Sequence, residues 1–162
     1  MPPDPQKLLA SGPLVFFVES GKPRTAHMQL SALFGSLEGA LRVCDPYYGT
    51  GSLSRLDLLT HCSTVLFLTS TPDKKERDFL PHLLKEFRQQ HNNFEFRSYG
   101  QKGLHDRYLL TDDQIILLGH GLKDIGGADS FVIKLDGDVA QDLIQQVRDS
   151  FDAKWKLALP LT

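Results

Sequence analysis

Hydrophobic residues form short runs or alternate with polar residues in several stretches, and these patterns predict the strands. The run PLVFFVES at 13–20 is rich in β-branched and aromatic residues. Residues 63–69 are continuously apolar, which is typical of a strand buried on both faces. Further strands are predicted at 41–44, 93–99, 104–111, 114–119 and 130–135. Asp112-Asp113 is expected to form a tight hairpin turn between two of them.

Apolar residues at a spacing near 3.6 predict four helices, at 25–38, 52–59, 73–91 and 138–156. The first helix counts Met28 among its buried residues, and the second begins with Ser52 as its cap. The third counts Phe79, and the last counts Val139 and Leu143.

Strands and helices alternate in the first part of the chain, and strands then follow one another before a closing helix. This order predicts an α/β domain with a mixed central sheet and helices on both faces, mostly parallel in its front half. A length of 162 residues suits one domain, and no internal repeat is visible. We place the domain at 13–157, with 1–12 as a proline-rich leader and 158–162 as a tail.

Composition and charge exclude several classes of protein. With 41% hydrophobic and 23% charged residues, the chain is neither disordered, collagen-like nor a coiled coil. The net charge of −2 argues against a non-specific nucleic-acid binder, which needs a basic surface. The sequence still allows a local positively charged cleft, because five basic residues gather in 85–107: Lys85, Arg88, Arg97, Lys102 and Arg107.

Cysteine usage and the absence of targeting signals predict a cytoplasmic setting. Cys44 and Cys62 lie in apolar runs and are expected to be buried free thiols, without the Cys/His spacing of a zinc site. The start of the sequence lacks the pattern of a signal peptide, and no apolar run is long enough to span a membrane.

Two segments carry candidate chemistry, and the first is the glycine-containing turn after strand 41–44. The string Asp45-Pro46-Tyr47-Tyr48-Gly49-Thr50-Gly51 resembles the first motif of Rossmann-type methyltransferases, which bind S-adenosylmethionine. However, the next strand ends in Leu68-Thr69-Ser70 without the expected acid, and no Pro-Pro pair follows Pro3. A methyltransferase is therefore our second alternative.

The second segment is His105-Asp106-Arg107-Tyr108-Leu109. Strand alternation puts His105 and Arg107 on one face. An arginine offers a planar fork to phosphate oxygens, and a neutral imidazole beside it is able to attack phosphorus or move a proton. The alternative to a phosphate site is that both side chains are simply exposed to solvent and bind no ligand.

A longer string around this pair extends the comparison. His105-x-Arg107-x4-Asp112-x6-Gly119 resembles the phospholipase D signature, His-x-Lys-x4-Asp-x6-Gly-Ser. Two further strings resemble a divergent, single-motif subset of that superfamily: Gly119-His120-Gly121-Leu122-Lys123-Asp124-Ile125-Gly126 and Asp45-Pro46-Tyr47. The C-terminal module of MIT-domain proteins and related bacterial proteins belong to this subset, and the resemblance covers about residues 40–135.

The resemblance implies roles for individual residues. His105 takes the place of the nucleophile, Arg107 that of the lysine that grips phosphate, and Asp112 that of a supporting aspartate. His120 stands where the family has serine. The remaining residues that the resemblance implies for ligand binding are Asp45, Tyr47, Gly119, Lys123 and Asp124.

These assignments leave two main hypotheses about function. The first is a phosphate- or phosphodiester-binding domain, possibly non-catalytic, that recognises an anionic ligand such as nucleic acid or a lipid headgroup, or a partner protein. The second is a metal-independent phosphodiesterase or nuclease in which a homodimer supplies two copies of His105. Neither requires a cofactor or a metal, and both are compatible with a chain that is a domain of a larger protein or complex.

Overall fold

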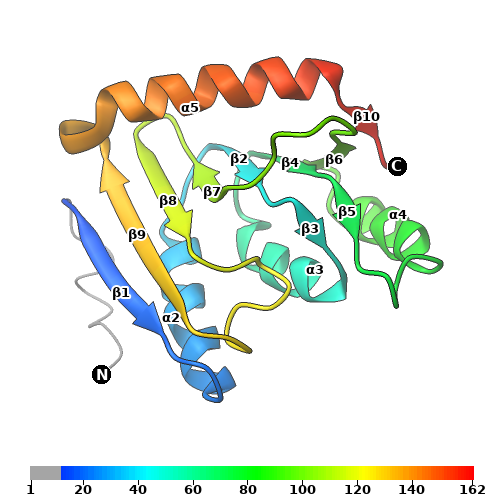
Figure 1. Ribbon diagram of the computed structural model, residues 1–162, viewed down its shortest axis with the longest axis horizontal. Helices are drawn as coiled ribbons and strands as arrows, with labels where there is room; N and C mark the ends of the chain where they lie inside the picture. Colours follow the sequence, from blue (N-terminus) through cyan, green and yellow to red (C-terminus); the bar gives the residue numbers. More distant parts are fainter. Residues whose placement is uncertain (1–11) are drawn as a thin grey trace.

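The computed structural model describes residues 12–162, which form a mixed sheet between two layers of helices (Figure 1). The sheet has eight strands in the order β1-β9-β8-β7-β2-β4-β6-β10. Their bounds are Leu14–Val18 (β1), Ala40–Cys44 (β2), Thr64–Thr69 (β4), Phe94–Ser98 (β6), Arg107–Leu110 (β7), Gln114–Leu118 (β8), Ser130–Asp136 (β9) and Leu159–Pro160 (β10). Two short strands, β3 (Tyr47–Tyr48) and β5 (Thr71–Pro72), pair separately.

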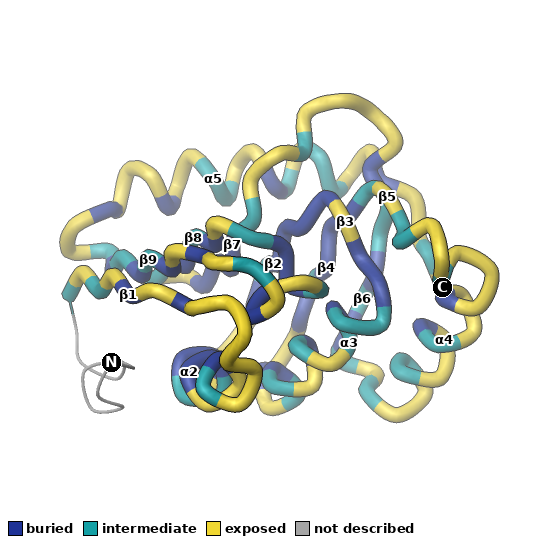
Figure 2. Tube along the Cα trace, turned by 60° about the horizontal axis from the view of Figure 1, so that its bottom comes forward, coloured by how far each residue is buried: buried dark blue, intermediate teal, exposed yellow. Residues whose placement is uncertain are grey.

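The helices lie on both faces of the sheet, as the sequence predicts. Figure 2 shows α5 (Gly137–Leu157) on one face and α2, α3 and α4 on the other. These three helices span Pro23–Gly35, Thr50–Leu56 and Leu80–Gln90. A 3₁₀ turn, η1 (Asp57–Leu59), follows α3.

The sheet is parallel in one half and antiparallel in the other. β4 pairs in parallel with β2 and with β6, whereas β7, β8 and β9 pair in antiparallel fashion. This confirms the predicted mixed sheet. The first strand, however, does not belong to the parallel half, because β1 pairs antiparallel with β9 at the far edge.

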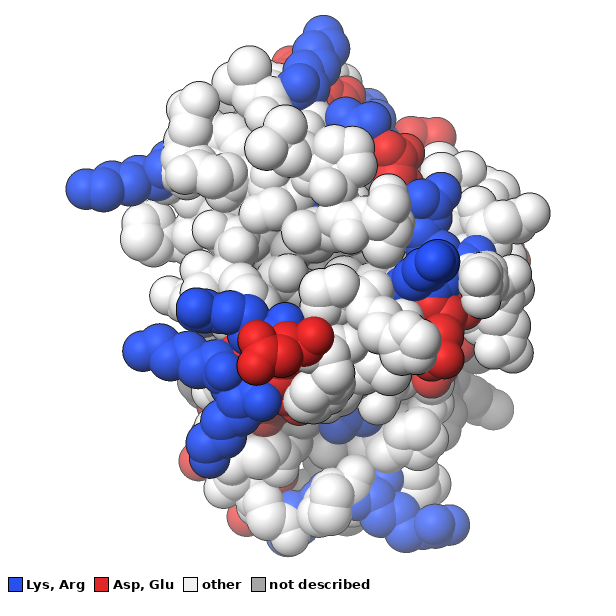
Figure 3. Space-filling model, turned by 90° about the vertical axis from the view of Figure 1, so that its right-hand side faces the viewer, with Lys and Arg blue, Asp and Glu red and all other residues white. Residues whose placement is uncertain are grey.

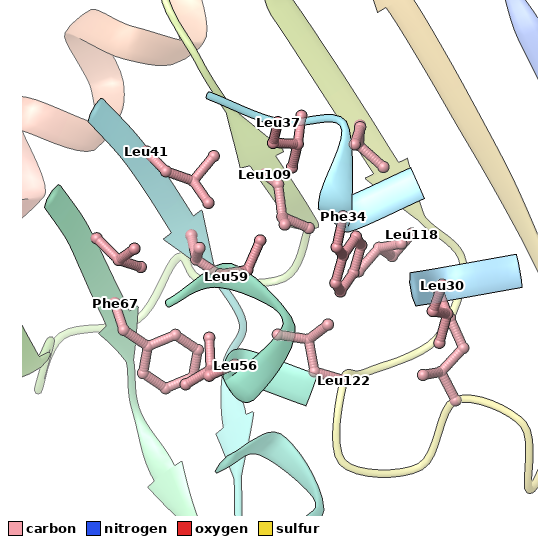
Figure 4. Packing of buried hydrophobic residues seen from close by; sticks show 14 of the residues in the cluster. Leu30, Phe34, Leu37, Leu41, Leu56, Leu59, Phe67, Leu109, Leu118 and Leu122 are labelled. Carbon is pink, nitrogen blue, oxygen red and sulfur yellow. The ribbon is translucent and has the colours of Figure 1, made fainter. Parts of the chain in front are cut away.

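Two hydrophobic clusters cover the two faces. The larger cluster lies between the sheet and the three helices α2, α3 and α4, where Phe34, Leu56 and Phe67 are almost completely buried (Figure 4). The smaller cluster lies under α5 and includes Tyr108 and Phe151. Alternation along β7 therefore sends Arg107 and Leu109 to one face and Tyr108 and Leu110 to the other.

Two predicted helix starts are wrong. The helix expected at 73–91 begins at Leu80, because Pro81 suits a first helical turn but not a helix interior. Phe79 lies before it and is 47% exposed. Ser52 does not cap α3 from its first position; it is the third helical residue, and its hydroxyl accepts the Gly49 N–H at 3.1 Å.

Three residues predicted to be buried on helices are exposed. Met28 on α2 is 63% exposed, and Val139 and Leu143 on α5 are 59% and 37% exposed. The backbone of α5 departs from helical angles at Ala140 (φ −132°, ψ 30°), and the buried side chains beyond it are Ile144 and Phe151. The start of α5 therefore leaves part of its apolar stripe in solvent.

The structure describes the predicted tail but almost none of the predicted leader. Nearly all of the leader predicted at 1–12 lies outside the described residues. The residues predicted as a tail at 158–162 include β10, which pairs with β6, and Leu161 N–H donates to the Phe96 carbonyl at 2.9 Å. Among the described helices none is both long and apolar enough to cross a membrane.

Both cysteines are buried and free, as predicted. Burial raises the pKa of the Cys44 thiol to about 12 and also raises the pKa of Cys62. Because the thiolate is the reactive form, we expect both to resist a thiol-specific reagent at mildly alkaline pH. Absorbance with a chromogenic disulfide should show no modification of the native protein and two thiols after denaturation. Rapid labelling of the native chain would contradict this burial.

Candidate functional site

The candidate site lies at the end of the sheet where β2 ends and β7 begins. Asp45 follows β2 directly, and its side chain is completely buried. One carboxylate oxygen accepts the Leu122 N–H at 2.7 Å, and the other accepts the Tyr47 N–H at 3.1 Å. Burial raises the pKa of Asp45, and these two amides and the nearby Arg107 oppose the rise. Asp45 thus holds the 119–126 turn against the end of β2.

Arg107, the first residue of β7, lies beside this carboxylate. Its Nε is 3.9 Å from Asp45 Oδ1, and its guanidinium carbon lies 5.9 Å from the centre of the Tyr47 ring. Nε is buried without a hydrogen-bond partner, while a quarter of the side chain, 26%, remains exposed. No acceptor among residues 12–162 hydrogen-bonds to the guanidinium. Because Nε is buried, an anion would have to bind at the exposed part of the guanidinium, which no described acceptor occupies.

The 119–126 turn packs closely on the site and on α3, and at one position, Gly51, this packing requires a glycine. A Cβ at Gly121 would lie 3.4 Å from both Arg107 Nε and an Asp45 oxygen. A Cβ at Gly51, in α3, would lie only 2.3 Å from the Lys123 carbonyl oxygen. The backbone of the turn thus packs directly on α3.

The protein's own backbone therefore accounts for Gly51, which the methyltransferase hypothesis assigned to a cofactor. Half of the sheet is antiparallel, unlike the mostly parallel doubly wound sheet of dinucleotide-binding folds. That second alternative is set aside.

Lys123 and two carboxylates close one side of the turn. Lys123 Nζ lies 2.7 Å from Asp124 Oδ2 and 3.3 Å from Asp73 Oδ2. The hydrogen bond to Asp124 is the main cause of a raised Lys123 pKa. To bind a phosphate, Lys123 would have to break its contacts with these two carboxylates. Arg107 makes fewer contacts with protein acceptors than Lys123 does.

Asp73 and Glu76 were not predicted as parts of this region. The Glu76 carboxylate accepts the Thr50 N–H at 2.7 Å and the Thr50 hydroxyl, which ties the 73–79 turn to the start of α3. Both acids lie in the stretch 73–91 that was predicted as helix. Pro81 was the available signal that this stretch is not helical.

His105 lies at the same end of the sheet, but the predicted strand does not reach it. β7 begins at Arg107, and His105 is exposed in the preceding segment. It lines a hollow of about 270 Å³ together with Cys44, Tyr108 and the α5 residues Leu143 and Val147. A second hollow, of about 320 Å³, runs from His105 to Ser70. Arg107 lines neither of them.

His120 and Gly119 follow β8 next to Arg107's strand. Gly119 N–H donates to the Phe131 carbonyl at 2.9 Å. His120 Nδ1 is buried without a hydrogen-bond partner, and the residue lines an open hollow of about 450 Å³ with Lys123 and Asp124. His120 therefore lies at the same end of the sheet as Arg107.

Asp112 lies at the other end of the sheet, in the turn between β7 and β8. Its side chain is 86% exposed and lies 3.7 Å from Arg148, whose guanidinium also donates to the Asp112 carbonyl at 2.8 Å. A direct contact between Asp112 and a ligand of Arg107 is excluded by this separation along β7. The supporting role implied for Asp112 stays a prediction.

The basic residues of 85–107 do not form one cleft. Arg97 bonds to Glu95 and lies over the Trp155 ring, Arg88 bonds to Thr162, and Arg107 faces Asp45. Figure 3, viewed from the side of α4 and β10, shows Lys and Arg in separate groups with Asp and Glu beside them. In the part of the chain that the structure describes, no three His, Cys, Asp or Glu side chains gather as a metal-ligand set.

Comparison with known proteins identifies the fold. No family model matches the sequence, and no curated protein matches it. Among solved structures, the phospholipase D family member Nuc from Salmonella typhimurium matches with a TM-score of 0.67 and 11% identity, over 91% of this chain and 97% of Nuc. NucT from Helicobacter pylori matches with a TM-score of 0.64 and 9% identity, over 91% of this chain and 98% of NucT.

A phosphatidylserine synthase from Haemophilus influenzae Rd KW20 is similar over part of its length. It matches with a TM-score of 0.66 and 14% identity, over 91% of this chain and 39% of the synthase. The matches to Nuc and NucT cover almost the whole of each chain, so the similarity extends to a complete domain. The chain therefore has the fold of the phospholipase D superfamily.

Proposed function

We propose that this domain binds a phosphate or phosphodiester group at Arg107 and does so without hydrolysing it. The observation that carries the proposal is a guanidinium that is oriented by a buried carboxylate and yet hydrogen-bonds to no described protein acceptor. Arginine forms two parallel, charge-assisted hydrogen bonds to phosphate oxygens. Tyr47, 48% exposed beside it, offers a ring face to the rest of the ligand.

Three features favour binding over catalysis. His105 precedes β7 and lines hollows that do not include Arg107. Lys123 is engaged by two carboxylates. His120 stands in place of the serine of the family signature. A nucleophile must lie within reach of the phosphorus that the cation holds. We therefore take the start of β7 at Arg107, which leaves His105 outside the strand, as the feature that opposes turnover.

The competing function is a metal-independent phosphodiesterase or nuclease in a homodimer. The exposure of His105 favours it, because an accessible imidazole is a possible nucleophile. Nuc is named as a phospholipase D family member, and the similar structure from Haemophilus influenzae is named as a phosphatidylserine synthase. Because both names refer to enzymes, catalysis is the alternative that experiment must exclude.

Arg107→Ala is the variant that tests binding. Using bis(p-nitrophenyl) phosphate, inorganic phosphate and single-stranded DNA as probes, calorimetry should show binding to the wild type that weakens roughly 10- to 100-fold in the variant. Arg24→Ala, which removes an exposed arginine on α2, is the matched control and should bind like the wild type. Equal affinities of Arg107→Ala and the wild type would reject the proposal.

The same probes separate binding from catalysis. With EDTA present, we expect no release of p-nitrophenolate and no shortening of labelled DNA or RNA. His105→Ala should keep the affinity of the wild type, because the proposal assigns anion binding to Arg107 and not to His105. Turnover that survives chelation and disappears in His105→Ala would establish the phosphodiesterase instead.

A further inference from the structure

We propose that residues 100–106, which we call the strap, form a second oxyanion site, in which the Lys102 ammonium and backbone N–H groups of the strap bind a phosphate group. The strap joins β6 to β7 and crosses the ends of β4 and β2, which lie between them in the sheet (Figure 1). Just before the strap, the Tyr99 N–H donates to the Thr69 carbonyl at 2.8 Å. Just after it, Arg107 begins β7. Both ends of the strap are therefore fixed to the sheet.

The backbone of the strap makes no hydrogen bonds with the part of the chain that the structure describes. None of its seven N–H groups donates to an acceptor in residues 12–162, and no donor there reaches its carbonyl groups. The 119–126 turn differs, because the N–H groups of Leu122, Asp124 and Ile125 all donate within the protein. Six of the seven strap residues are exposed, so their N–H groups pair with water, which an anion is able to displace.

The strap lines the hollow of about 320 Å³ that runs from His105 to Ser70. Among the described residues no acid lines this hollow, because Asp106 lines the other hollow, the one against α5. Lys102 does line it, and the Lys102 ammonium makes no ion pair or hydrogen bond within residues 12–162. The Ser70 hydroxyl is likewise without a hydrogen-bond partner in that range. The hollow therefore presents donors and a positive charge without a carboxylate.

The length of the strap allows it to adapt to an anion. Three strand spacings separate β6 from β7, a distance of about 14 Å, whereas the chain from Tyr99 to Arg107 is able to span about 26 Å. Gly103 has a φ of +122°, which an L side chain rarely adopts, and no atom lies within 4 Å of the position of its Cβ. Leu104 is the strap residue that packs against the smaller hydrophobic cluster. The strap on either side of Leu104 is thus able to move without breaking a backbone hydrogen bond.

A phosphate group suits this hollow because it has several oxygens. These oxygens accept hydrogen bonds from more than one backbone N–H at a time, while the negative charge pairs with the Lys102 ammonium. Lysine acts as a point charge, and the strap loses conformational freedom when it closes on a ligand, so this site should bind more weakly than the Arg107 guanidinium. Arg107 does not line the hollow. The strap site is therefore independent of the proposed function at Arg107.

Residue-resolved NMR of the backbone amides tests the site, with inorganic phosphate and bis(p-nitrophenyl) phosphate as probes at constant ionic strength. The amide resonances of 100–104 should shift and saturate in the wild type, and Lys102→Ala should raise the dissociation constant roughly tenfold. Gly103→Ala strains the strap backbone without meeting a neighbouring atom, and it should weaken binding as well. Inorganic phosphate represents a free anion, and the diester represents a phosphate within a larger ligand. Saturation by either supports the site and identifies the source.

Lys85→Ala is the matched control, because Lys85 is an exposed lysine on α4 that does not line the hollow. It should bind like the wild type. Arg107→Ala should still show saturation of the strap amides, so a failure of the proposed function is distinguishable from a failure of this site. The inference would be overturned by strap amides that shift with neither probe or that shift equally with chloride. An unchanged dissociation constant in Lys102→Ala would overturn it too.

Discussion

Asp45→Ala should lower the free energy of unfolding by about 3–5 kcal/mol. The substitution leaves the buried Leu122 N–H and the partly buried Tyr47 N–H without their acceptor and deprives Arg107 of its nearest carboxylate. Each unsatisfied buried donor costs about 1–3 kcal/mol, which sets the scale. Urea denaturation followed by circular dichroism measures the change.

Asp78→Ala is the control for that experiment. Asp78 is exposed in the turn before α4, and its removal should change stability by less than about 0.5 kcal/mol. If Asp45→Ala were no more destabilising than this control, the 119–126 turn would not depend on the buried carboxylate.

The raised pKa of Asp45 also predicts how stability varies with pH. Burial makes the folded protein hold this proton more tightly than the unfolded chain does. The contribution of Asp45 to stability is therefore complete below the ordinary aspartate pKa and is lost as the pH rises through the raised value. The difference in unfolding free energy between the wild type and Asp45→Asn, measured across the acid range, should follow this direction. A difference that grows in the opposite direction would contradict the buried state of the carboxyl.

Gly51→Ala is the second large expected effect, a loss of about 1–3 kcal/mol or more. The new methyl group would lie 2.3 Å from the Lys123 carbonyl oxygen and 2.9 Å from its Cα, and backbone yields less easily than a side chain. The turn that carries Leu122 must move away from α3, so the phosphate affinity attributed to Arg107 should fall as well. Thermal denaturation and calorimetry measure the two effects.

Gly35→Ala provides the matched comparison. Gly35 ends α2, and a Cβ there meets no atom within 4 Å. Alanine favours a helix over glycine by up to about 1 kcal/mol, so this variant should be neutral or more stable. Equal behaviour of the two glycine variants would show that the close approach at Gly51 is not required.

The sequence predicted the main strands because each carries its own hydrophobic signal. The seven longer strands and α5 lie where apolar runs and helical spacing predict them. The structure also brings Asp45 together with the 119–126 turn, the two segments that carry part of the resemblance to the phospholipase D subset. The fold prediction is confirmed, while the roles of the site residues stay predictions.

What the sequence did not predict depends on contacts between distant segments. The strands β3, β5 and β10 have two residues each, too few for a periodic pattern. The bond between Glu76 and Thr50 joins residues 26 positions apart, and no local rule selects that partner. Met28 and Val139 have the spacing of buried residues but face no neighbouring element, since periodicity predicts a face and not what covers it.

The hydrogen bond from Leu122 to Asp45 spans 77 positions of the chain. Forming a contact of such separation carries a loop-closure entropy cost that other contacts must offset. An intermediate that contains only the parallel strands β2, β4 and β6 would already have much of the larger core but no arrangement of the 119–126 turn. The hydrogen-exchange rate of the Leu122 amide should therefore report whether the antiparallel half of the sheet has docked, separately from the rest of the fold.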